Sequence, residues 1–464
     1  MFSAPLDCLI PSRQHFSRLA WPGKRKLLFI VGALILLLLT TLLCLFCIPR
    51  AVPAVPSVVP FNYGVNMVRG VNLGGWLVVE PWLAQSVFMT LNDTRIFDEW
   101  TFCLYQDHDT ATTILEQHWE TFITEEDFRE IAAAGLNHVR IPIPYYAFDV
   151  QPGEPYIQGQ LEYLDKAVQW ASKYNLKIII DLHAAPGSQN SFDNSGHITT
   201  DPEWANNTNY VRRTTDIVRT IAQKYQNSSK IVPMLEPLNE PAGFLGAPVL
   251  DIVKPFYYES YNATRWPFGD SGPANKSDII VLLSDAFQSS IYWRGFMPYP
   301  EWEGVMVDRH VYQIYSDPEI TRSWDEHIQF ACHNSTQDFA NSTLWQITGE
   351  WALATTDCSV SPHIYPRGLG SRYDGTKNHT VPLGNCAGLS GDATSFNQDY
   401  KVFLRKYWEA QVTAFERESQ GWTMWTWKAE NADDWSYQAG LKNGWIPWNI
   451  TERMYPGLCE ETTL

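Results

Sequence analysis

Eight short apolar runs recur along the chain, and polar or turn-forming residues separate them. They span residues 67–75, 138–144, 177–184, 231–240, 278–285, 304–313, 344–351 and 421–428. Apolar runs of this length between turn-forming residues are typical of buried strands. We therefore predict a β-strand within each run.

Amphipathic helices are predicted between several of these strands. Residues 124–136, 161–176 and 210–225 repeat apolar residues at helical spacing. The first of these segments opens with Thr124 and Asp127, which have the spacing of a capping box. Eight strands that alternate with helices predict a parallel sheet closed into a (β/α)8 TIM barrel. We assign residues 65–464 to one catalytic domain with this α/β fold.

Most of the apolar runs end in polar or aromatic residues. In chain order these are Asn72, Arg140, His183, Asn239, Glu240, His310, Tyr312, Glu350 and Trp427. The carboxyl ends of all barrel strands meet at one face, where such enzymes place their chemistry. We therefore expect these side chains to surround one pocket.

Two of the residues at this face are glutamates, Glu240 after the fourth strand and Glu350 after the seventh. Glycoside hydrolysis requires such a pair, because one carboxyl group protonates the leaving oxygen while the other attacks or activates water. A separation of about 5–5.5 Å would indicate retention of configuration through a covalent intermediate. Arg140 would keep the nucleophile ionised by charge pairing, and Trp427 would offer a flat apolar face to a sugar ring.

The N-terminal region has the pattern of a membrane anchor. Residues 27–48 run 22 residues without a charge, and five basic residues precede them. This length crosses a hydrocarbon core of about 30 Å, and the charge bias predicts a cytoplasmic tail over residues 1–26. Residues 49–64 are then a stalk. We predict a single-pass type II protein of the plasma membrane whose catalytic domain faces the cell wall; a signal peptide cleaved near Ala54, giving a secreted protein, is the alternative.

Sequons and cysteines agree with a secretory route. Asn-x-Ser/Thr occurs at Asn92, Asn206, Asn227, Asn262, Asn275, Asn334, Asn341, Asn378 and Asn449. The predicted extracellular part holds Cys103, Cys332, Cys358, Cys386 and Cys459. Five cysteines allow two disulfides and one free thiol, and spacing alone leaves the pairing open. Since the cysteines and histidines of this extracellular part form no C-x-x-C or H-x-x-x-H pair, we predict no metal site there, and we predict no cofactor.

The charge of the chain excludes one class of partner. Residues 1–50 hold six basic residues and one acidic residue, which leaves 28 basic against 50 acidic in the rest, a formal charge of −22. Such a charge argues against nucleic acid or a polyanionic substrate. It is compatible with a neutral polymer such as a glucan.

The motifs at the strand ends resemble those of one family. They read RGVNLGGWLVVEPW, HVRIPIPYYAF, DLHAAPGSQNSFDNSG, NEP, DRHVYQIY, GEW and GWTMWTWKAENADDWS, in this order. Together, over residues 65–459, they resemble the fungal exo-β-1,3-glucanases of glycoside hydrolase family 5, of which membrane-anchored forms are known.

The resemblance implies a role for each matching residue. Glu240 would be the acid/base and Glu350 the nucleophile, and Asn239 would bond the sugar 2-hydroxyl. Glu80 would grip the terminal glucose above Trp427 as the floor of its subsite. Supporting residues would be Arg140, His183, His310 and Tyr312, and an aromatic clamp at the pocket entrance would be formed by Phe192 and Tyr315. At Tyr315 the family has phenylalanine. The implied disulfides are Cys332–Cys459 and Cys358–Cys386, with Cys103 free.

The resemblance implies a retaining exo-1,3-β-glucosidase that releases glucose from the non-reducing ends of cell-wall β-1,3-glucan. Alternatives are a β-glucan transglycosylase or an endo-β-1,6-glucanase with the same site, and a non-catalytic glucan-binding surface protein. Some residues also have simpler interpretations: Arg140 as a structural ion pair, Trp427 as part of the core, and Glu240 as a helix cap.

Overall fold

The computed structural model describes residues 58–89, 93–269, 272–359, 370–377 and 380–460. The predicted cytoplasmic tail (1–26), the predicted transmembrane helix (27–48) and most of the stalk lie outside these residues. Within them, each helix is too short or too polar to span a bilayer.

Eight parallel strands form a closed barrel, as the alternating pattern predicts. They are β1 (Val68–Asn72), β2 (His138–Pro144), β3 (Lys177–Ala184), β4 (Met234–Glu236), β5 (Ile280–Ser284), β6 (Val305–Val311), β7 (Trp345–Trp351) and β8 (Gly421–Met424). The strands pair in sequence order, and β8 closes on β1 through Val68 and Gly421. The (β/α)8 prediction is therefore confirmed.

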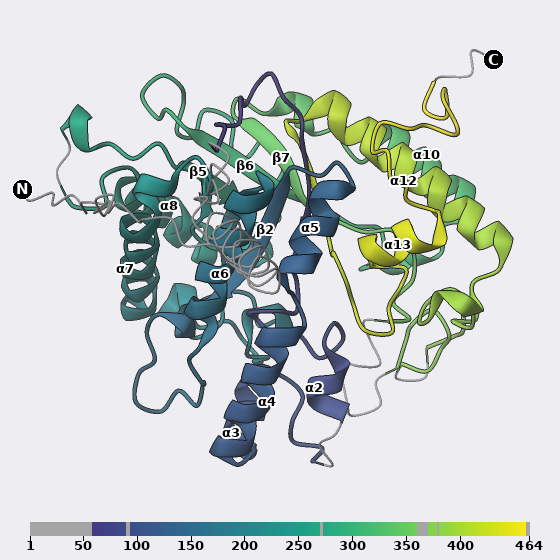
Figure 1. Cartoon of the computed structure of the whole chain (residues 1–464), viewed down its shortest axis with the longest axis horizontal. Coiled ribbons are helices and arrows are strands. Elements are labelled where there is room, and N and C mark those ends of the chain that lie inside the picture. Colours follow the sequence, from purple (N-terminus) through teal and green to yellow (C-terminus); the bar gives the residue numbers. More distant parts are fainter. Residues whose placement is uncertain (1–57, 90–92, 270–271, 360–369, 378–379, 461–464) are drawn as a thin grey trace, which may run out of the picture. The chain divides into compact units, whose positions relative to one another are not determined.

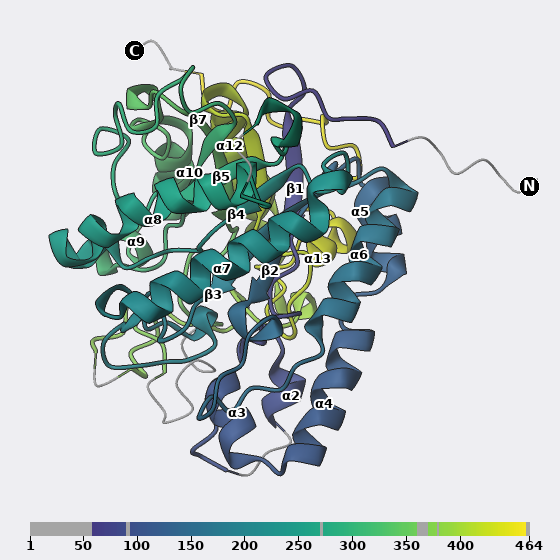
Figure 2. The ribbon, with the colours of Figure 1, turned by 90° about the vertical axis from the view of Figure 1, so that its left-hand side faces the viewer.

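Helices lie around the barrel, as Figure 1 shows for α5 to α8, α10 and α12. The helices with described bounds are α2 (Gln85–Met89), α3 (Glu99–Tyr105), α4 (His108–Thr121), α5 (Glu125–Ala133), α6 (Gln160–Tyr174), α7 (Thr208–Tyr225), α8 (Ala247–Arg265), α9 (Asp317–Ile320), α10 (Trp324–His333), α12 (Gln398–Glu418) and α13 (Tyr437–Asn443). Figure 2 shows α7 and α8 side by side across the strands. The three helices expected from periodicity correspond to α5, α6 and α7, and Asp127 caps α5 by accepting hydrogen bonds from Thr124.

Six of the strands are shorter than their apolar runs, and β4 and β8 each end four residues before their run does. β4 covers only Met234–Glu236, because Pro233 and Pro237 flank it and proline has no N–H for the ladder. β8 ends at Met424, so the residues after it leave the alternation of a strand. In both, strand alternation stops before the predicted site residues Asn239, Glu240 and Trp427.

The interior of the barrel changes from apolar to charged along the strands. A cluster of six buried side chains fills its amino-terminal part: Val68, Ile179, Met234, Leu282, Met306 and Ile347. Two residues further on, the same faces of β3, β4 and β6 carry the buried carboxylates of Asp181, Glu236 and Asp308. The apolar layer thus closes one end of the barrel and supports a charged layer above it.

Both disulfides that the resemblance implied are present. Cys332 bonds to Cys459 and Cys358 bonds to Cys386. Cys103 is free and buried. The first disulfide ties the C-terminal segment to α10, which fits an oxidising compartment.

Buried carboxyl groups make the stability depend on pH, and Asp434 is the clearest case. Burial raises the pKa of Asp434 to about 7. The folded state therefore holds this proton more tightly than the unfolded state, and the stability it contributes is lost as pH rises from about 4 to about 7. We expect Asp434→Asn to reduce the difference in unfolding free energy between pH 5 and pH 8 by about 2–3 kcal/mol. Denaturant titration at both pH values measures this, and an unchanged difference would contradict the assigned shift.

Candidate active site

Arg140 lies at the centre of the charged layer and is completely buried. Its guanidinium donates to Glu236 Oε2 at 2.8 and 3.0 Å and to Glu350 Oε1 at 2.7 Å. It also lies 3.2 Å from Asp181 and 3.5 Å from Asp308. Burial lowers the pKa of Arg140, but these four carboxyl groups outweigh it and raise that pKa well above its ordinary value. Arg140 is thus a structural ion-pair centre and also a direct partner of Glu350.

Glu350 lies on β7, and its side chain is bonded within the charged layer. Oε1 accepts the bond from Arg140, and Oε2 accepts a hydrogen bond from the Tyr312 hydroxyl at 2.9 Å. The preceding Gly349 is required by space, since a Cβ there would lie 2.0 Å from the Asp308 carboxylate. Both donors to Glu350 are fixed, and one of them is a permanent cation.

Glu240 lies at the end of a loop after β4, with a left-handed backbone (φ 44°). Oε1 lies 2.6 Å from Nδ1 of His310, and Oε2 accepts from Asn194 Nδ2 at 3.0 Å. One carboxylate oxygen of Glu240, one of Glu350 and a ring nitrogen of His310 all lie within 4.8 Å of one another. A left-handed non-glycine residue is uncommon and clusters at functional sites.

These three titratable groups are in contact and titrate as a unit. Burial lowers the pKa of His310, but Glu350, Asp308 and Glu240 outweigh it and raise that pKa well above its ordinary value. Burial raises the pKa of Glu240, yet the charge of His310 outweighs this and the net shift is downward. Burial raises the pKa of Glu350, and His310 and Arg140 offset it only in part. One proton is therefore held on the short contact between His310 and Glu240.

Several buried polar atoms around this pair have no hydrogen-bond partner among the described residues. They include Glu80 Oε1, Asp193 Oδ2, Asn239 Nδ2 and His183 Nε2. Asn239 and His183 are held on their other side: Asn239 Oδ1 accepts from Arg140 at 2.9 Å, and Nδ1 of His183 lies 2.5 Å from Asp181. Because an unsatisfied buried polar group is costly, such atoms indicate a place for a polar ligand.

Two of these groups, Glu80 and Asp193, are carboxyl groups, and burial disfavours their ionised form. Burial and the neighbouring Asp193 raise the pKa of Glu80 well above its ordinary value. Burial raises the pKa of Asp193 to about 7. A neutral ligand rich in hydroxyl groups suits such acceptors better than an anion does.

The tryptophan at the site is Trp425, and the prediction for Trp427 is wrong. Trp427 is completely buried, and its indole N–H donates to Asp127 of α5 at 2.9 Å, outside the barrel. Trp425 instead stacks on the His183 ring, with centroids 5.4 Å apart and planes 12° apart. The error arose because β8 ends at Met424, so strand alternation does not extend to residue 427. The core interpretation of Trp427 holds.

Exposed aromatic rings lie on loops beside the pair. Phe192, in the loop that carries Asn194, is 42% exposed and stacks on Phe244 at 5.9 Å, and Phe244 contacts Phe287 at 5.4 Å. Tyr315 is 58% exposed and packs on Tyr312 at 5.3 Å. Large apolar side chains exposed together in this way mark a binding surface.

The spacing of two triads would also suit a metal ion: Glu236, Asp308 and His310, and Glu240, His310 and Glu350. In the first, Arg140 already bonds Glu236 and lies near Asp308; in the second, it bonds Glu350. Its positive charge would repel a divalent cation at this distance. The donor set therefore suits a neutral ligand.

Comparison with known proteins identifies the family. Residues 104–364 match the family model described as cellulase, glycosyl hydrolase family 5. A probable glucan 1,3-beta-glucosidase A of Aspergillus fumigatus is 40% identical over 418 residues, which are 88% of this chain and 95% of that protein. The chain belongs to glycosyl hydrolase family 5.

Other similarities agree with membership of family 5. A glucan 1,3-beta-glucosidase of Blumeria graminis is 39% identical over 427 residues, 91% of this chain and 96% of that protein. The crystal structure of a rutinosidase from Aspergillus niger aligns with a TM-score of 0.64 and 20% identity over 84% of this chain and all of that one. The latter shows a shared fold. This family 5 member is a glycoside hydrolase, as predicted.

Sequence reasoning missed several residues of this family 5 site. Asp181 and Asp308 precede the predicted His183 and His310 by two positions, so strand periodicity alone places them on the same inward face. Glu236, which is not among the predicted residues, is likewise inward and bonds Arg140. Asn194 lies in a loop, and its contact with Glu240 had no signal beyond the motif SFDNSG.

Proposed function

We propose that this chain is a retaining exo-1,3-β-glucosidase that releases glucose from the non-reducing ends of β-1,3-glucan. The observation that carries the proposal is the pairing of Glu240 with Glu350, whose nearest oxygens lie within 4.8 Å. This is the short separation of retaining enzymes, since inverting enzymes leave about 6.5–9.5 Å for a water molecule. The names of the fungal relatives support β-1,3-glucan as the substrate.

Glu350 is the proposed nucleophile. Its carboxylate attacks the anomeric carbon while the glycosidic C–O bond breaks, and a glycosyl ester forms. Arg140 and Tyr312 hold both of its oxygens, so the attacking group needs little reorganisation. Glu350 must be ionised to attack, and burial raises its pKa. As the pH is lowered, kcat/KM should therefore begin to fall while the pH is still above the ordinary carboxyl range.

Glu240 is the proposed acid and base. It gives the proton shared with His310 to the leaving oxygen, then takes a proton from the water that attacks the anomeric carbon and breaks the ester. Two inversions at that carbon give net retention. His310 buffers this proton, since its ring contacts both Glu240 and Glu350, at 2.6 and 3.4 Å.

The atoms left without partners would bind the terminal glucose. Glu80 and Asp193 would accept bonds from its hydroxyl groups, and Asn239 Nδ2 would donate to the 2-hydroxyl. Trp425 takes the place that was predicted for Trp427 beneath the sugar ring. Partners that are fixed in this way would bind one terminal glucose residue of the glucan, which agrees with exo cleavage.

Tyr312→Phe tests the environment of Glu350. The variant removes one of the two bonds to the nucleophile and keeps the ring packing on Tyr315. We expect kcat on an aryl β-glucoside to fall about 10- to 100-fold with KM changed less. A change confined to KM would contradict the proposed contact.

Transglycosylation by the same intermediate is a second candidate activity. The contiguous exposed rings of Phe192, Phe244 and Phe287 favour it, because they offer an incoming sugar a surface from which to displace water. Among the described residues no comparable feature favours endo-β-1,6 cleavage, and a protein that only binds glucan has no need of the carboxyl pair.

The location is also a proposal. The uncharged run 27–48 supports a type II anchor in the plasma membrane, with the catalytic domain outside the cell. The full-length chain should then stay in the membrane fraction after a carbonate wash. Release into the soluble fraction would favour cleavage near Ala54.

Product sizes test exo action. The purified chain would be incubated with linear β-1,3-glucan labelled at its reducing end, and products would be separated by length in the first minutes. Free unlabelled glucose as the first product supports the proposal. Labelled short oligosaccharides at the start would indicate endo cleavage. Labelled chains longer than the substrate would indicate transfer, because the acceptor glucan keeps its labelled reducing end.

A further inference from the structure

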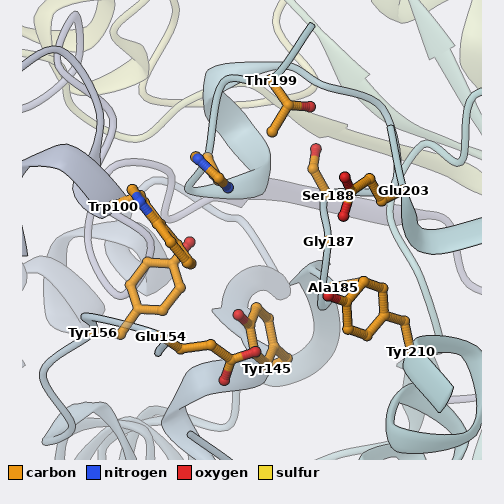
Figure 3. A pocket seen from close by; sticks show the side chains of 11 residues that line it. Trp100, Tyr145, Glu154, Tyr156, Ala185, Gly187, Ser188, Thr199, Glu203 and Tyr210 are labelled. Atoms are coloured by element: carbon orange, nitrogen blue, oxygen red, sulfur yellow. The ribbon is translucent and has the colours of Figure 1, made fainter. Parts of the chain in front are cut away.

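A cavity apart from the carboxyl pair, here called the side cavity, has a volume of about 140 Å³. None of Glu240, Glu350 and His310 lines it. Figure 3 shows Trp100 and Tyr156 on one side, with Ser188, Thr199 and Glu203 opposite. Drug-sized ligands occupy roughly 300–1,000 Å³, so the side cavity suits a ligand no larger than one sugar ring.

The aromatic wall of the side cavity is rigid. The Trp100 indole stacks on His197, with centroids 4.1 Å apart, and meets Tyr156 edge-on at 5.3 Å. Tyr156 also meets Tyr145 edge-on at 5.8 Å. Rings that are held by one another lose little freedom when a ligand packs on them.

The opposite wall is polar and carries an available acceptor. Glu203 is exposed, and within the described part of the chain its carboxylate has no hydrogen-bond or ion-pair partner. Glu154, the other carboxylate of the lining, is instead held by Arg213 at 2.8 and 3.0 Å. Glu203 can therefore accept hydrogen bonds from a ligand, and the hydroxyls of Ser188 and Thr199 lie on the same side.

The charges of the lining exclude an anionic ligand. Burial lowers the pKa of His197 to about 4, so its ring is neutral at physiological pH. The Arg213 guanidinium behind the wall is already occupied by Glu154 and Asp149. What remains is aromatic surface facing hydroxyl and carboxylate oxygens, which is the chemistry that recognises a neutral polyhydroxylated ring.

We propose that the side cavity is a second carbohydrate-binding site, which holds one neutral sugar residue of a β-glucan. The identity of this sugar rests on the proposed function. The segment from residue 185 to 199 forms one wall of the cavity and also carries Asn194, which bonds Glu240. A glucan held in the side cavity is thereby kept beside the catalytic site.

The test compares polymer binding with catalysis. Glu203→Ala and the cavity-filling Thr199→Trp would each be made in the full chain that also carries Glu350→Gln, which prevents digestion of the glucan. The fraction of each protein that insoluble β-1,3-glucan removes from solution would then be measured. We expect each to weaken retention about five- to tenfold, the effect of losing a hydrogen bond or one packed ring. Asp201→Ala, an exposed neighbour outside the lining, is the matched control and should bind like the parent.

The same substitutions in the chain with Glu350 intact should leave aryl-glucoside hydrolysis within about twofold, since neither residue lies in the catalytic site. Unchanged retention of both variants would overturn the second site, whatever the catalytic result. Binding of tetramethylammonium that is lost in Glu203→Ala, with glucan retention unchanged, would also overturn it in favour of a cation site. Failure of the unsubstituted chain to hydrolyse the aryl glucoside would instead overturn the proposed function.

Discussion

Glu350→Gln is expected to reduce hydrolysis of an aryl β-glucoside by at least about 10⁴-fold while the protein stays folded. Glutamine keeps the shape of the side chain and an oxygen that accepts from Arg140. It lacks the negative charge that must attack the anomeric carbon. Steady-state kinetics measure the loss, and an unchanged thermal unfolding midpoint would show that the barrel is intact.

Chemical rescue separates the loss of a nucleophile from the loss of structure. In Glu350→Ala, azide can enter the space of the missing carboxylate and attack the anomeric carbon, which yields α-glucosyl azide by a single inversion. The exposed Glu301→Gln is the matched control and should keep full activity. Activity retained by Glu350→Gln, or rescue that yields only the β-azide, would contradict the assignment of Glu350.

Glu240→Ala is expected to slow the cleavage of substrates with poor leaving groups more than that of substrates with good ones, because only a poor leaving group needs a proton from an acid. General acid–base catalysis contributes about 10²- to 10⁴-fold, so hydrolysis of β-1,3-glucan, whose leaving group is a poor one, should fall by about this factor. Formation of the glycosyl-enzyme from a dinitrophenyl glucoside needs no proton and should be far less affected. Pre-steady-state release of dinitrophenol measures that step.

Azide again provides a control. In Glu240→Ala it should accelerate breakdown of the glycosyl-enzyme and give β-glucosyl azide, the opposite anomer from that expected with Glu350→Ala. An equal loss on good and poor leaving groups would contradict the acid/base role. The two variants thus distinguish the partners of the pair by product stereochemistry.

The burial of so many charges around Arg140 explains why the carboxyl groups of Glu240 and Glu350 can differ in protonation. Glu350 is held by a permanent cation and a phenol, whereas Glu240 is held by a titratable ring and an amide. In a water-poor site such differences have large effects on protonation. The charged layer therefore costs folding free energy and in return gives two similar side chains different environments.

Much of the fold and the centre of the site could be predicted from the sequence. The apolar runs identify the strands, and strand ends placed Arg140, Glu240 and Glu350 at one face, where the structure brings them together. The prediction failed where a strand ended early: Trp427, the aromatic end of its apolar run, lies three residues beyond Met424, while Trp425 lies at the site. A two-residue repeat holds only while the backbone stays extended.

Loop contacts are the part that the sequence could not supply. Asn194 and Phe244 lie in segments without a period, and their positions depend on turns and on packing against distant residues. Phe244 stacks on Phe192 although 52 positions separate them. No local pattern encodes such a contact, because tertiary packing determines it.

The most direct test of the central claim, a covalent double displacement by Glu240 and Glu350, is the anomeric form of the first product. The purified chain would be mixed with linear β-1,3-glucan, and proton NMR spectra would be recorded before mutarotation mixes the anomers. Glucose that appears first as the β-anomer and only later as the α-anomer is the predicted result. Initial α-glucose would show a single displacement by water and would contradict the account.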